Sequence, residues 1–288
     1  MSERRTTLRE EGYGPLLRGW RERRHLTQLD LALEADVSAR HLSFLETGRT
    51  LPSREMVLTL ARALDLPLRE RNAMLLAAGY APIYGETPLD DERMREVRLA
   101  LELILKAHEP YSAFACDRYW NLVMANAAYV GFLRYTIGPR AADLEPYTVL
   151  PEPRLNVLRL VFDPQGLRRY LANWEEVAQA MLEQVQRGAL WSRDHAMHAL
   201  IADLLAYPGV PAHWSNPLPS DTGRLVIPCE LTNLGAPRNA RMFSTVTTLS
   251  APLDVTLQDL HIEAFYPADR ETAALSFYGD AGIDSRRE

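Results

Sequence analysis

The chain has 288 residues, 47% of them hydrophobic, and a net charge of −6 at pH 7, which fits a soluble globular protein with room for two domains. It has no run of 18 apolar residues, and its charged N-terminus has no apolar signal-peptide centre. We therefore expect a cytoplasmic protein with no membrane partner. Cys116 and Cys229 lie far apart without metal-ligand spacing, so we expect two buried thiols.

The negative charge is unevenly distributed along the chain. Residues 1–80 carry a net charge of +2, from 13 arginines and 11 acidic residues, whereas the remainder carries −8. A surface that binds nucleic acid is therefore expected in the first part only, and its basic side chains must be judged by their local placement.

Five short helices are predicted in residues 1–80, which we expect to form an all-α first domain. The first spans about 14–24 and the second about 28–35. Ser38 and Ser53 are suited to cap the starts of the third and fourth helices, because a serine hydroxyl can accept an orphan backbone N–H. The fifth helix is predicted over 69–78.

The second and third of these helices have the pattern of a helix-turn-helix. Leu29, Ala32 and Leu33 recur at i, i+3 and i+4, which predicts an apolar stripe along the second helix. Asp36 and Val37 form the expected turn. This spacing favours two helices packed across a short turn.

The third helix divides into an apolar face and a free N-terminal face. Leu42 and Leu45 are predicted to point inward, and Gly48 to end the helix in a left-handed cap. A recognition helix requires this division, since its N-terminal residues reach base edges in the major groove. The residues left on the outer face are Ala39, Arg40, His41, Ser43 and Phe44.

The stretch 27–53, with Arg21 before it and Pro52-Ser53 at its end, resembles the XRE/Cro/phage-repressor family of regulators. The resemblance covers about residues 10–80 and implies a lambda-repressor-like fold that binds a double-stranded DNA operator. A helical bundle that binds protein, as in antitoxin-like modules, is the alternative. The combined register of caps, apolar stripe and glycine favours DNA binding.

The resemblance also assigns roles to single residues. In the family, the residue matching Glu46 pairs with an arginine at the place of Arg21. Arg40 matches the base-reading position, where an arginine can bind guanine O6 and N7. Gln28 resembles the phosphate anchor, and Arg49 is also expected at the DNA backbone. The candidate DNA-binding residues are Gln28, Ser38, Ala39, Arg40, His41, Ser43, Phe44, Thr47 and Arg49.

Residues 81–91 lie in a stretch rich in Gly and Pro, and we predict that they link the first domain to a second one over 92–288. The second domain is expected to open with a helix over about 92–108. Its apolar surface is unusually wide, which a dimer interface and a deep core explain equally well. The residues of this surface are Met94, Val97, Leu99, Leu101, Leu103, Ile104 and Leu105.

The rest of the second domain mixes strands and helices. Two short strands are predicted around Asp117 and Arg118 as a hairpin. Helices are predicted over about 126–135, 153–162, 167–187 and 192–206, and strands over 224–234, 241–249 and 260–266. The predicted fold class is α+β, with a small PAS-like antiparallel sheet covered by helices on one side.

Several motifs of this domain resemble the ligand-binding domain of MmyB-like regulators. They are Trp120, Asn126, Asp163-Pro164 and the Asn173-Trp174-Glu175 run, and the resemblance covers roughly residues 95–270. In that family a PAS-like sensor follows an XRE-type domain, as in the order found here. The resemblance implies a transcription factor that responds to a small molecule.

A PAS-like fold leaves a gap between its sheet and its helices, where a ligand can bind. Many candidates for the lining are aromatic or aliphatic and few are polar, which favours an apolar ligand with one polar or acidic head, such as a fatty acid. No cofactor is required. For each residue the alternative is a core or surface position. The candidates are Phe114, Trp120, Met124, Asn126, Phe132, Tyr147, Asn156, Val157, Arg159, Leu160, Trp174, Met181 and His195.

The sequence contains no nucleophile elbow, phosphate-binding glycine loop or Rossmann fingerprint, so we expect no catalytic residues. Asp194, His195 and His198 follow one another at helical spacing and could bind a metal ion. Without further ligands nearby in the sequence, hydrogen-bonded or solvated histidines are favoured, and no metal site is expected.

These patterns predict a one-component transcription factor that binds an operator through residues 1–80 and senses a small molecule through residues 92–288. We expect a homodimer, because operators of this class have two-fold symmetry. Two alternatives stay open. The second domain could be an enzyme that the helix-turn-helix localises, or the first domain could bind protein and not DNA.

Overall fold

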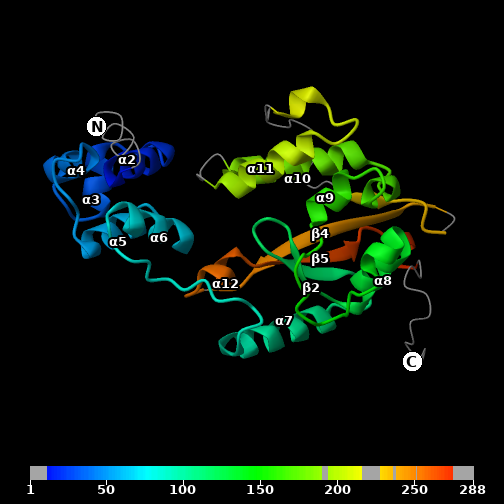
Figure 1. Ribbon diagram of the computed structural model, residues 1–288. Helices are drawn as coiled ribbons and strands as arrows, with labels where there is room; N and C mark the ends of the chain where they lie inside the picture. The colour runs from blue at the N-terminus through cyan, green and yellow to red at the C-terminus, as the bar shows by residue number, and fades with distance from the viewer. Residues whose placement is uncertain (1–11, 190–193, 216–227, 236–237, 251, 275–288) are drawn as a thin grey trace. The chain divides into compact units, whose positions relative to one another are not determined.

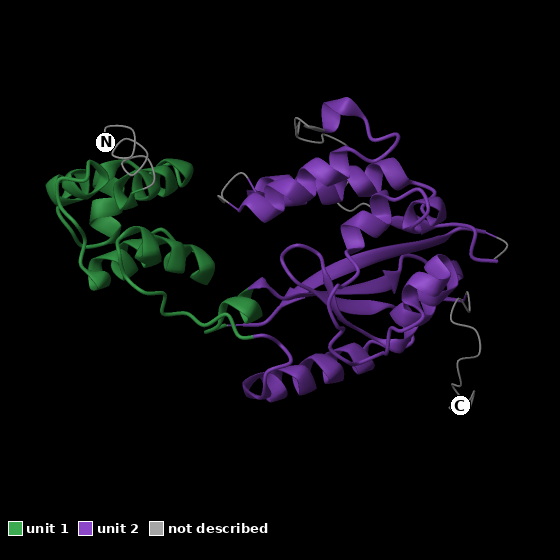
Figure 2. Ribbon diagram, viewed as in Figure 1, with its two compact units in different colours: residues 1–87, 251–258 green, residues 88–250, 259–288 purple. Residues whose placement is uncertain are grey.

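The computed structural model describes residues 12–189, 194–215, 228–235, 238–250 and 252–274. The chain divides into two compact units (Figure 2). The first unit groups residues 1–87 with residues 251–258, and the second unit holds the rest. A short segment from late in the chain therefore belongs to the same unit as the N-terminal helices.

Five helices are described in the first unit before residue 87, as predicted (Figure 1). They are α2 (Tyr13–Arg23), α3 (Gln28–Glu34), α4 (Ala39–Glu46), α5 (Arg54–Ala63) and α6 (Leu68–Ala77). Each helix contributes a fully buried residue to one core cluster: Leu17, Leu31, Leu42, Leu60 and Leu75. Isolated helices this short are marginal in water, so burial of this core stabilises them. Each buried leucine contributes roughly 1.5–3 kcal/mol.

The predicted apolar stripe of α3 is wrong. Leu29 and Leu33 are exposed, at 59% and 71%, whereas Leu31 and Ala32 are buried, as is Ala35 just after the helix. The sequence has leucines at every second position, so helical spacing alone offers two competing faces. The fold uses the face whose alanines allow a close approach to the neighbouring helices.

The helix starts follow the capping residues that the sequence offers. Thr27 and Asp30 form a capping box, in which the Thr27 hydroxyl accepts from the Asp30 backbone N–H at 3.1 Å and the Asp30 carboxylate accepts from the Thr27 N–H at 2.8 Å. Ser38 and Ser53 each accept a backbone N–H at 3.1 Å at the starts of α4 and α5. Gly48 follows α4 with a φ of +69°, a conformation that favours glycine.

The second unit is built on a five-stranded antiparallel sheet in the order β2-β1-β5-β4-β3, which establishes the predicted α+β class. Its strands are β1 (Ala113–Cys116), β2 (Leu122–Ala125), β3 (Cys229–Leu231), β4 (Ala240–Thr248) and β5 (His261–Pro267). The strand predicted over 224–234 is shorter in the structure, and its residues 224–227 lie outside the described residues.

The main helices of the second unit agree with the predicted order. They are α7 (Arg95–Ala107), α8 (Ala127–Ile137), α9 (Val157–Phe162), α10 (Trp174–Ala189) and α11 (His195–Leu205). The sequence analysis did not predict two short helices late in the chain, α12 (Val255–Asp259) and α13 (Arg270–Ala273). Among the described residues, no helix has both the length and the apolar character needed to cross a membrane.

Helices lie on both faces of the sheet, where the prediction placed them on one (Figure 1). Phe114 of β1 lines a cavity together with residues of α8, α9 and α10. Met124 of β2, which pairs with Ala115, lines a separate hollow with Leu99 and Glu102 of α7. β1 and β2 are buried at every residue, as expected for strands covered on both faces.

Helix α7 leaves part of its wide apolar surface uncovered. Leu101 and Leu105 are fully buried, but Leu99, Leu103 and Ile104 are 52%, 68% and 40% exposed. Within one chain, the deep-core explanation is therefore wrong for these three residues. A dimer interface stays a prediction.

Candidate functional site

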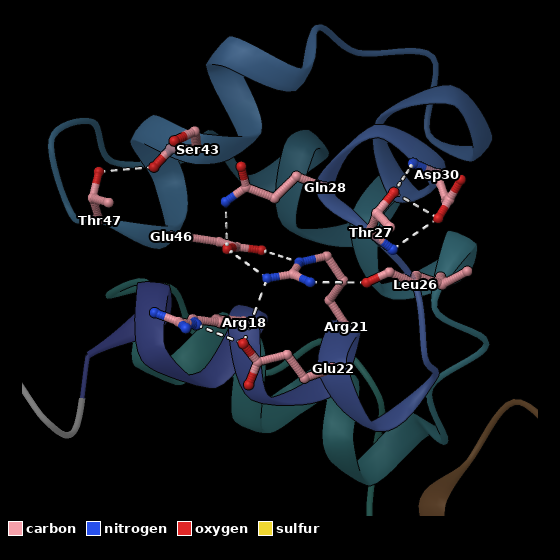
Figure 3. Close-up of polar contacts among 10 residues, drawn as sticks. All are labelled: Arg18, Arg21, Glu22, Leu26, Thr27, Gln28, Asp30, Ser43, Glu46 and Thr47. Atoms are coloured by element: carbon pink, nitrogen blue, oxygen red, sulfur yellow. Dashed lines mark hydrogen bonds and ion pairs between the residues drawn. The ribbon is translucent and has the colours of Figure 1, made fainter.

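A buried ion pair links the helices of the helix-turn-helix (Figure 3). Arg21 of α2 binds Glu46 of α4 with both ends of its guanidinium, Nε to Oε1 at 2.6 Å and Nη2 to Oε2 at 3.0 Å. Arg21 Nη1 also donates to the Leu26 carbonyl at 2.8 Å. The hydrogen bond to Glu46 raises the pKa of Arg21 above its usual value, so the guanidinium stays charged.

The two helices also pack backbone against backbone at this point. A Cβ atom added to Gly14 of α2 would lie 2.5 Å from the Glu46 carbonyl oxygen, which is closer than real contacts allow. Together with the ion pair, this contact fixes α4 against α2. The recognition helix is therefore held rigidly, as precise contact with base edges requires.

Gln28, the candidate phosphate anchor, lies at the start of α3 and its side-chain amide donates to Glu46 Oε2 at 2.8 Å. Glu46, on α4, thus accepts hydrogen bonds from side chains of two other helices, α2 and α3 (Figure 3). The structure brings Gln28 to the ion pair of Arg21 and Glu46.

Two arginines, Arg40 on α4 and Arg49 just after it, lie around one aromatic ring. The guanidinium carbons of Arg40 and Arg49 lie 5.4 Å and 5.5 Å from the centre of the Phe44 ring. Cation–π contacts of this kind contribute ~0.5–1 kcal/mol at exposed sites. Phe44, half-buried, therefore provides an apolar platform that places both cations on the same side of the domain.

The remaining candidate DNA-binding residues on and beside α4 differ in exposure. Ala39, His41 and Ser43 are half-buried, whereas Ser38 and Thr47 are exposed. The Thr47 hydroxyl donates to the Ser43 carbonyl at 2.7 Å.

Arg40 and Arg49 differ from Arg18 and Arg24 in their partners. Arg18 forms an ion pair with Glu22 at 2.7 Å, and Arg24 lies 3.8 Å from Asp65. Within the described part of the chain, neither Arg40 nor Arg49 forms an ion pair. Their guanidinium groups are available to a phosphate, which is anionic, or to the acceptor atoms of a guanine edge.

The second unit contains a cavity between its sheet and the helices α8, α9 and α10. The cavity has a volume of about 80 Å³, more than a single water molecule needs, and it is partly open to solvent. Four of the predicted lining residues are in its wall, namely Phe114, Phe132, Val157 and Met181. The wall also includes Ser112, Tyr129, Val161, Leu167, Leu171, Val177, Cys229, Leu231, Met242, Glu263 and Phe265.

One acidic side chain stands in this wall of mostly apolar residues. Glu263 of β5 is 8% exposed, and burial raises its pKa to about 7, against the opposing effect of a hydrogen bond with Ser244. Sequence reasoning missed Glu263. A signal was present, because the strand sequence H-I-E-A-F-Y places a carboxylate between apolar residues that the sheet buries.

Several predicted lining residues have structural roles outside the cavity. Asn126 and Asn156 cap the starts of α8 and α9, and each also donates to a backbone carbonyl, Tyr111 at 2.7 Å and Tyr119 at 2.6 Å respectively. Leu160 is fully buried in the core.

Four other predicted residues are also found away from this cavity. The Tyr147 hydroxyl donates to Glu109 at 2.6 Å, and Tyr147 lines the separate hollow beside α7, as Met124 does. Arg159 forms an exposed ion pair with Asp203 at 2.5 Å. His195 is exposed at the first position of α11.

Trp120 and Trp174, both predicted to line the cavity, are buried against neighbouring rings and charges. Trp120 meets His261 edge to face at 5.0 Å. The Trp174 indole donates to the Val161 carbonyl at 2.9 Å, and Arg168 covers its ring at 3.4 Å. Both tryptophans pack in the core cluster around the cavity.

The Asp194 carboxylate has structural contacts instead of metal-like ones. It caps α11 through backbone N–H groups, accepts from the Tyr119 hydroxyl at 2.7 Å and lies 3.2 Å from Arg118. Among the described residues, no group of three His, Cys, Asp or Glu side chains could hold a metal ion.

A helix-turn-helix with two unpaired arginines, one on its recognition helix and one just after it, followed by a sheet domain with an apolar cavity, defines the class of ligand-regulated DNA-binding proteins. Residues 17–71 match the family model for a helix-turn-helix. Residues 97–276 match the model of the MmyB-like transcription regulator ligand binding domain, and because that match covers more than half of the chain, the protein belongs to the MmyB-like transcription regulators. No curated protein matches the chain.

Proposed function

We propose that this regulator reads a two-fold symmetric DNA operator as a homodimer and that a small apolar molecule in the cavity of the second unit controls binding. The observation that carries the proposal is the cavity itself, because close-packed protein interiors contain few voids larger than a water molecule. Its mostly apolar wall supports a ligand with an apolar body, such as an alkyl chain. A cavity between an antiparallel sheet and overlying helices also supports a PAS-like sensor.

DNA recognition depends on the outer face of α4. Arg40, near the N-terminus of the helix, reads a guanine, and Arg49, just beyond its C-terminal end, binds a phosphate. Phosphate contacts make affinity fall steeply as salt rises. Fluorescence anisotropy with the DNA upstream of the protein's own gene, at 50 and 200 mM salt, tests DNA binding. A protein-interaction module would show no salt-dependent shift.

The ligand proposal is tested by extraction of small molecules from the denatured, freshly purified protein and their identification by mass spectrometry. A stoichiometric apolar compound supports the sensor function. Recovery of that compound unchanged after prolonged incubation argues against turnover in the second unit. Stabilisation of the protein by polar metabolites only would contradict an apolar ligand.

The chain itself offers a route from the cavity to the DNA-binding unit. Strands β4 and β5 contribute Met242, Glu263 and Phe265 to the cavity wall, and their connection includes residues 251–258, which belong to the first unit. A ligand that displaces these strands therefore acts on a segment of the DNA-binding unit. It shifts the balance only by the difference in its affinity for the two states.

Polar contacts hold this segment in the first unit. Asp254 accepts from the Thr87 hydroxyl at 2.8 Å, and the Gln258 side chain accepts from the Leu68 backbone N–H at 2.5 Å at the start of α6. We expect Asp254→Ala to leave operator affinity of the ligand-free protein nearly intact but to bring the ratio of affinities with and without ligand close to one. Leu253→Ala, at an 83% exposed neighbour, is the matched control and should keep the ratio.

The homodimer is proposed to form through the uncovered face of α7, where Leu99, Leu103 and Ile104 are exposed. A second copy of the same helix would bury these side chains by two-fold symmetry. Analytical ultracentrifugation of Leu103→Glu should show a monomer. Leu253→Glu places the same charge at an exposed leucine in the first unit and should remain dimeric. A dimeric Leu103→Glu protein would contradict this interface.

A further inference from the structure

Glu263 is the charged side chain in an otherwise neutral cavity wall. It lies in the middle of β5, paired with Phe114 of β1 and Val246 of β4, and shares its face of the strand with Phe265 two residues on. Because Phe114 and Phe265 both line the cavity, the strand alternation directs Glu263 to the same space.

Few groups of the protein stabilise the negative charge of the Glu263 carboxylate. Among the described residues, no cationic side chain forms an ion pair with Glu263, and the hydroxyl of Ser244 is the hydrogen-bond partner that acts on its charge. An ionised carboxylate has about four acceptor sites, and one hydroxyl fills one of them. Glu263 lines the cavity, where most of the other lining side chains are apolar and cannot fill the remaining acceptor sites.

A purely structural role does not explain this arrangement. A carboxyl group that only joined β5 to β4 through Ser244 could be replaced by a neutral amide or hydroxyl at lower cost of desolvation. Burial of an acid beside an apolar hollow is instead typical of binding sites, where few polar groups orient an apolar ligand.

We propose that Glu263 binds the polar end of the ligand, and that this end is a hydrogen-bond donor with positive charge, a protonated amine, on an apolar body. The inference rests on the proposed function, because it assumes that the ligand occupies this cavity. Two molecules with the same apolar chain should therefore differ in affinity. An amine gains an ion pair with Glu263, whereas an ionised fatty acid meets a like charge.

The other titratable groups around the cavity do not replace this contact. Burial raises the pKa of both Cys116 on β1 and Cys229 on β3, and Glu263 adds to both shifts, so the thiols are neutral. Burial lowers the pKa of His261, two residues away on β5, so its ring is uncharged at pH 7. Tyr129 of α8 completes the titratable groups of the described wall.

The test measures binding of 1-octylamine, 1-octanol and octanoate to the full chain by calorimetry and thermal melting at pH 6 and pH 8. The three probes share one alkyl chain and differ in the head group. We expect octylamine to bind at least about tenfold more tightly than octanoate at pH 8. Octylamine affinity should rise about tenfold from pH 6 to pH 8, because Glu263 loses its proton around pH 7 in the folded protein.

Glu263→Gln should remove both the preference for the amine and its pH dependence while octanol binding persists. Glu183→Gln is the matched control, because Glu183 is equally buried, at 5% exposure, but lies outside the cavity wall and bonds to Gln179. This control should retain the amine preference. If the Glu263 variant does not fold, the pH dependence of the wild-type protein decides alone.

The outcomes test the role of Glu263 and the ligand-binding function of the cavity separately. Equal or tighter binding of octanoate in the wild-type protein, or unchanged amine binding by Glu263→Gln, overturns the role of Glu263 and leaves the cavity function standing. Failure of octanol as well as octylamine and octanoate to bind overturns the cavity as the ligand site, and the inference fails with it.

Discussion

The two units of this regulator each bury a carboxylate, and they treat it in opposite ways. Glu46 in the helix-turn-helix is 7% exposed and receives hydrogen bonds from both Arg21 and Gln28. Glu263 in the cavity wall is 8% exposed and is compensated by a serine hydroxyl. The protein itself pairs the charge of Glu46, which stabilises the fold. Glu263 can accept further hydrogen bonds from a molecule outside the chain.

The same contrast applies to the surface of the first unit. Arg18 forms an ion pair within its own helix, while Arg40 and Arg49 lie beside the Phe44 ring without a described carboxylate partner. Charges that the fold does not neutralise are available to partners outside the chain. Four experiments, ordered by expected effect, test that reading.

The largest effect, on the free energy of unfolding, is expected when Glu46 loses its ion-pair partner. Arg21→Ala leaves Glu46 buried without its cation, which should lower the free energy of unfolding of the first unit by about 3–5 kcal/mol. Urea unfolding followed by circular dichroism measures this loss. The double variant Arg21→Met with Glu46→Leu removes both charges and should recover most of the stability. Equal losses in the single and double variants would contradict a role for the charge pair.

The cavity carboxylate should make stability depend on pH. The pKa of Glu263 in the folded state, about 7, lies above the ordinary value of 4.5, so its favourable contribution is present below pH 4.5 and is lost as pH rises through 7. We expect the wild-type free energy of unfolding to fall by about 2–3 kcal/mol more between pH 5 and pH 8 than that of Glu263→Gln. Parallel pH profiles for the two proteins would show that the carboxyl group is not desolvated.

The unpaired arginines should separate base reading from phosphate binding. Arg40→Ala should cost about 1–3 kcal/mol on the preferred operator and reduce discrimination between bases at one position. Arg49→Ala should weaken binding to all sequences alike and lower the salt dependence of binding by about one ion. Anisotropy titrations with an operator and its single-base variants measure both. An equal loss on every sequence for Arg40→Ala would remove its base-reading role.

The smallest effect is expected from the one hydroxyl that supports the cavity acid. Ser244→Ala should destabilise the folded protein by about 1 kcal/mol at pH 8, where the carboxylate is ionised, and by less at pH 5. It should also move the pH midpoint of the stability profile upward, since Ser244 lowers the pKa of Glu263. An unchanged midpoint in the same urea series would show that the hydroxyl does not act on the carboxyl group.

The local signals in the sequence were sufficient where neighbouring residues decide the structure. Ser38 and Ser53 cap the helices that they were predicted to start, and the hairpin around Asp117 and Arg118 forms between β1 and β2. Capping and turn geometry involve residues within four positions, so the chain encodes them locally. The order of the strands and helices follows from the same kind of information.

Predictions that depended on which face is covered were less secure. For α3, alternating leucines gave two equivalent stripes, and the partner helices chose the one with Leu31. For the cavity, Phe114, Phe132, Val157 and Met181 were predicted as lining, but Asn126 and Asn156 proved to be helix caps. Periodicity places apolar or polar residues on one face of a helix or strand, but it does not show what covers that face.

The sequence by itself determined the family, the helix-turn-helix and the two-part organisation, because repeated local patterns of caps, glycines and apolar residues define them. Only the tertiary structure decided that Glu263 faces a cavity, that Gln28 reaches Glu46, and that residues 251–258 join the first unit. These contacts connect residues 18 to almost 200 positions apart. Their energies depend on the surroundings that a folded chain creates, in which the cost of an unpaired charge rises as water is excluded.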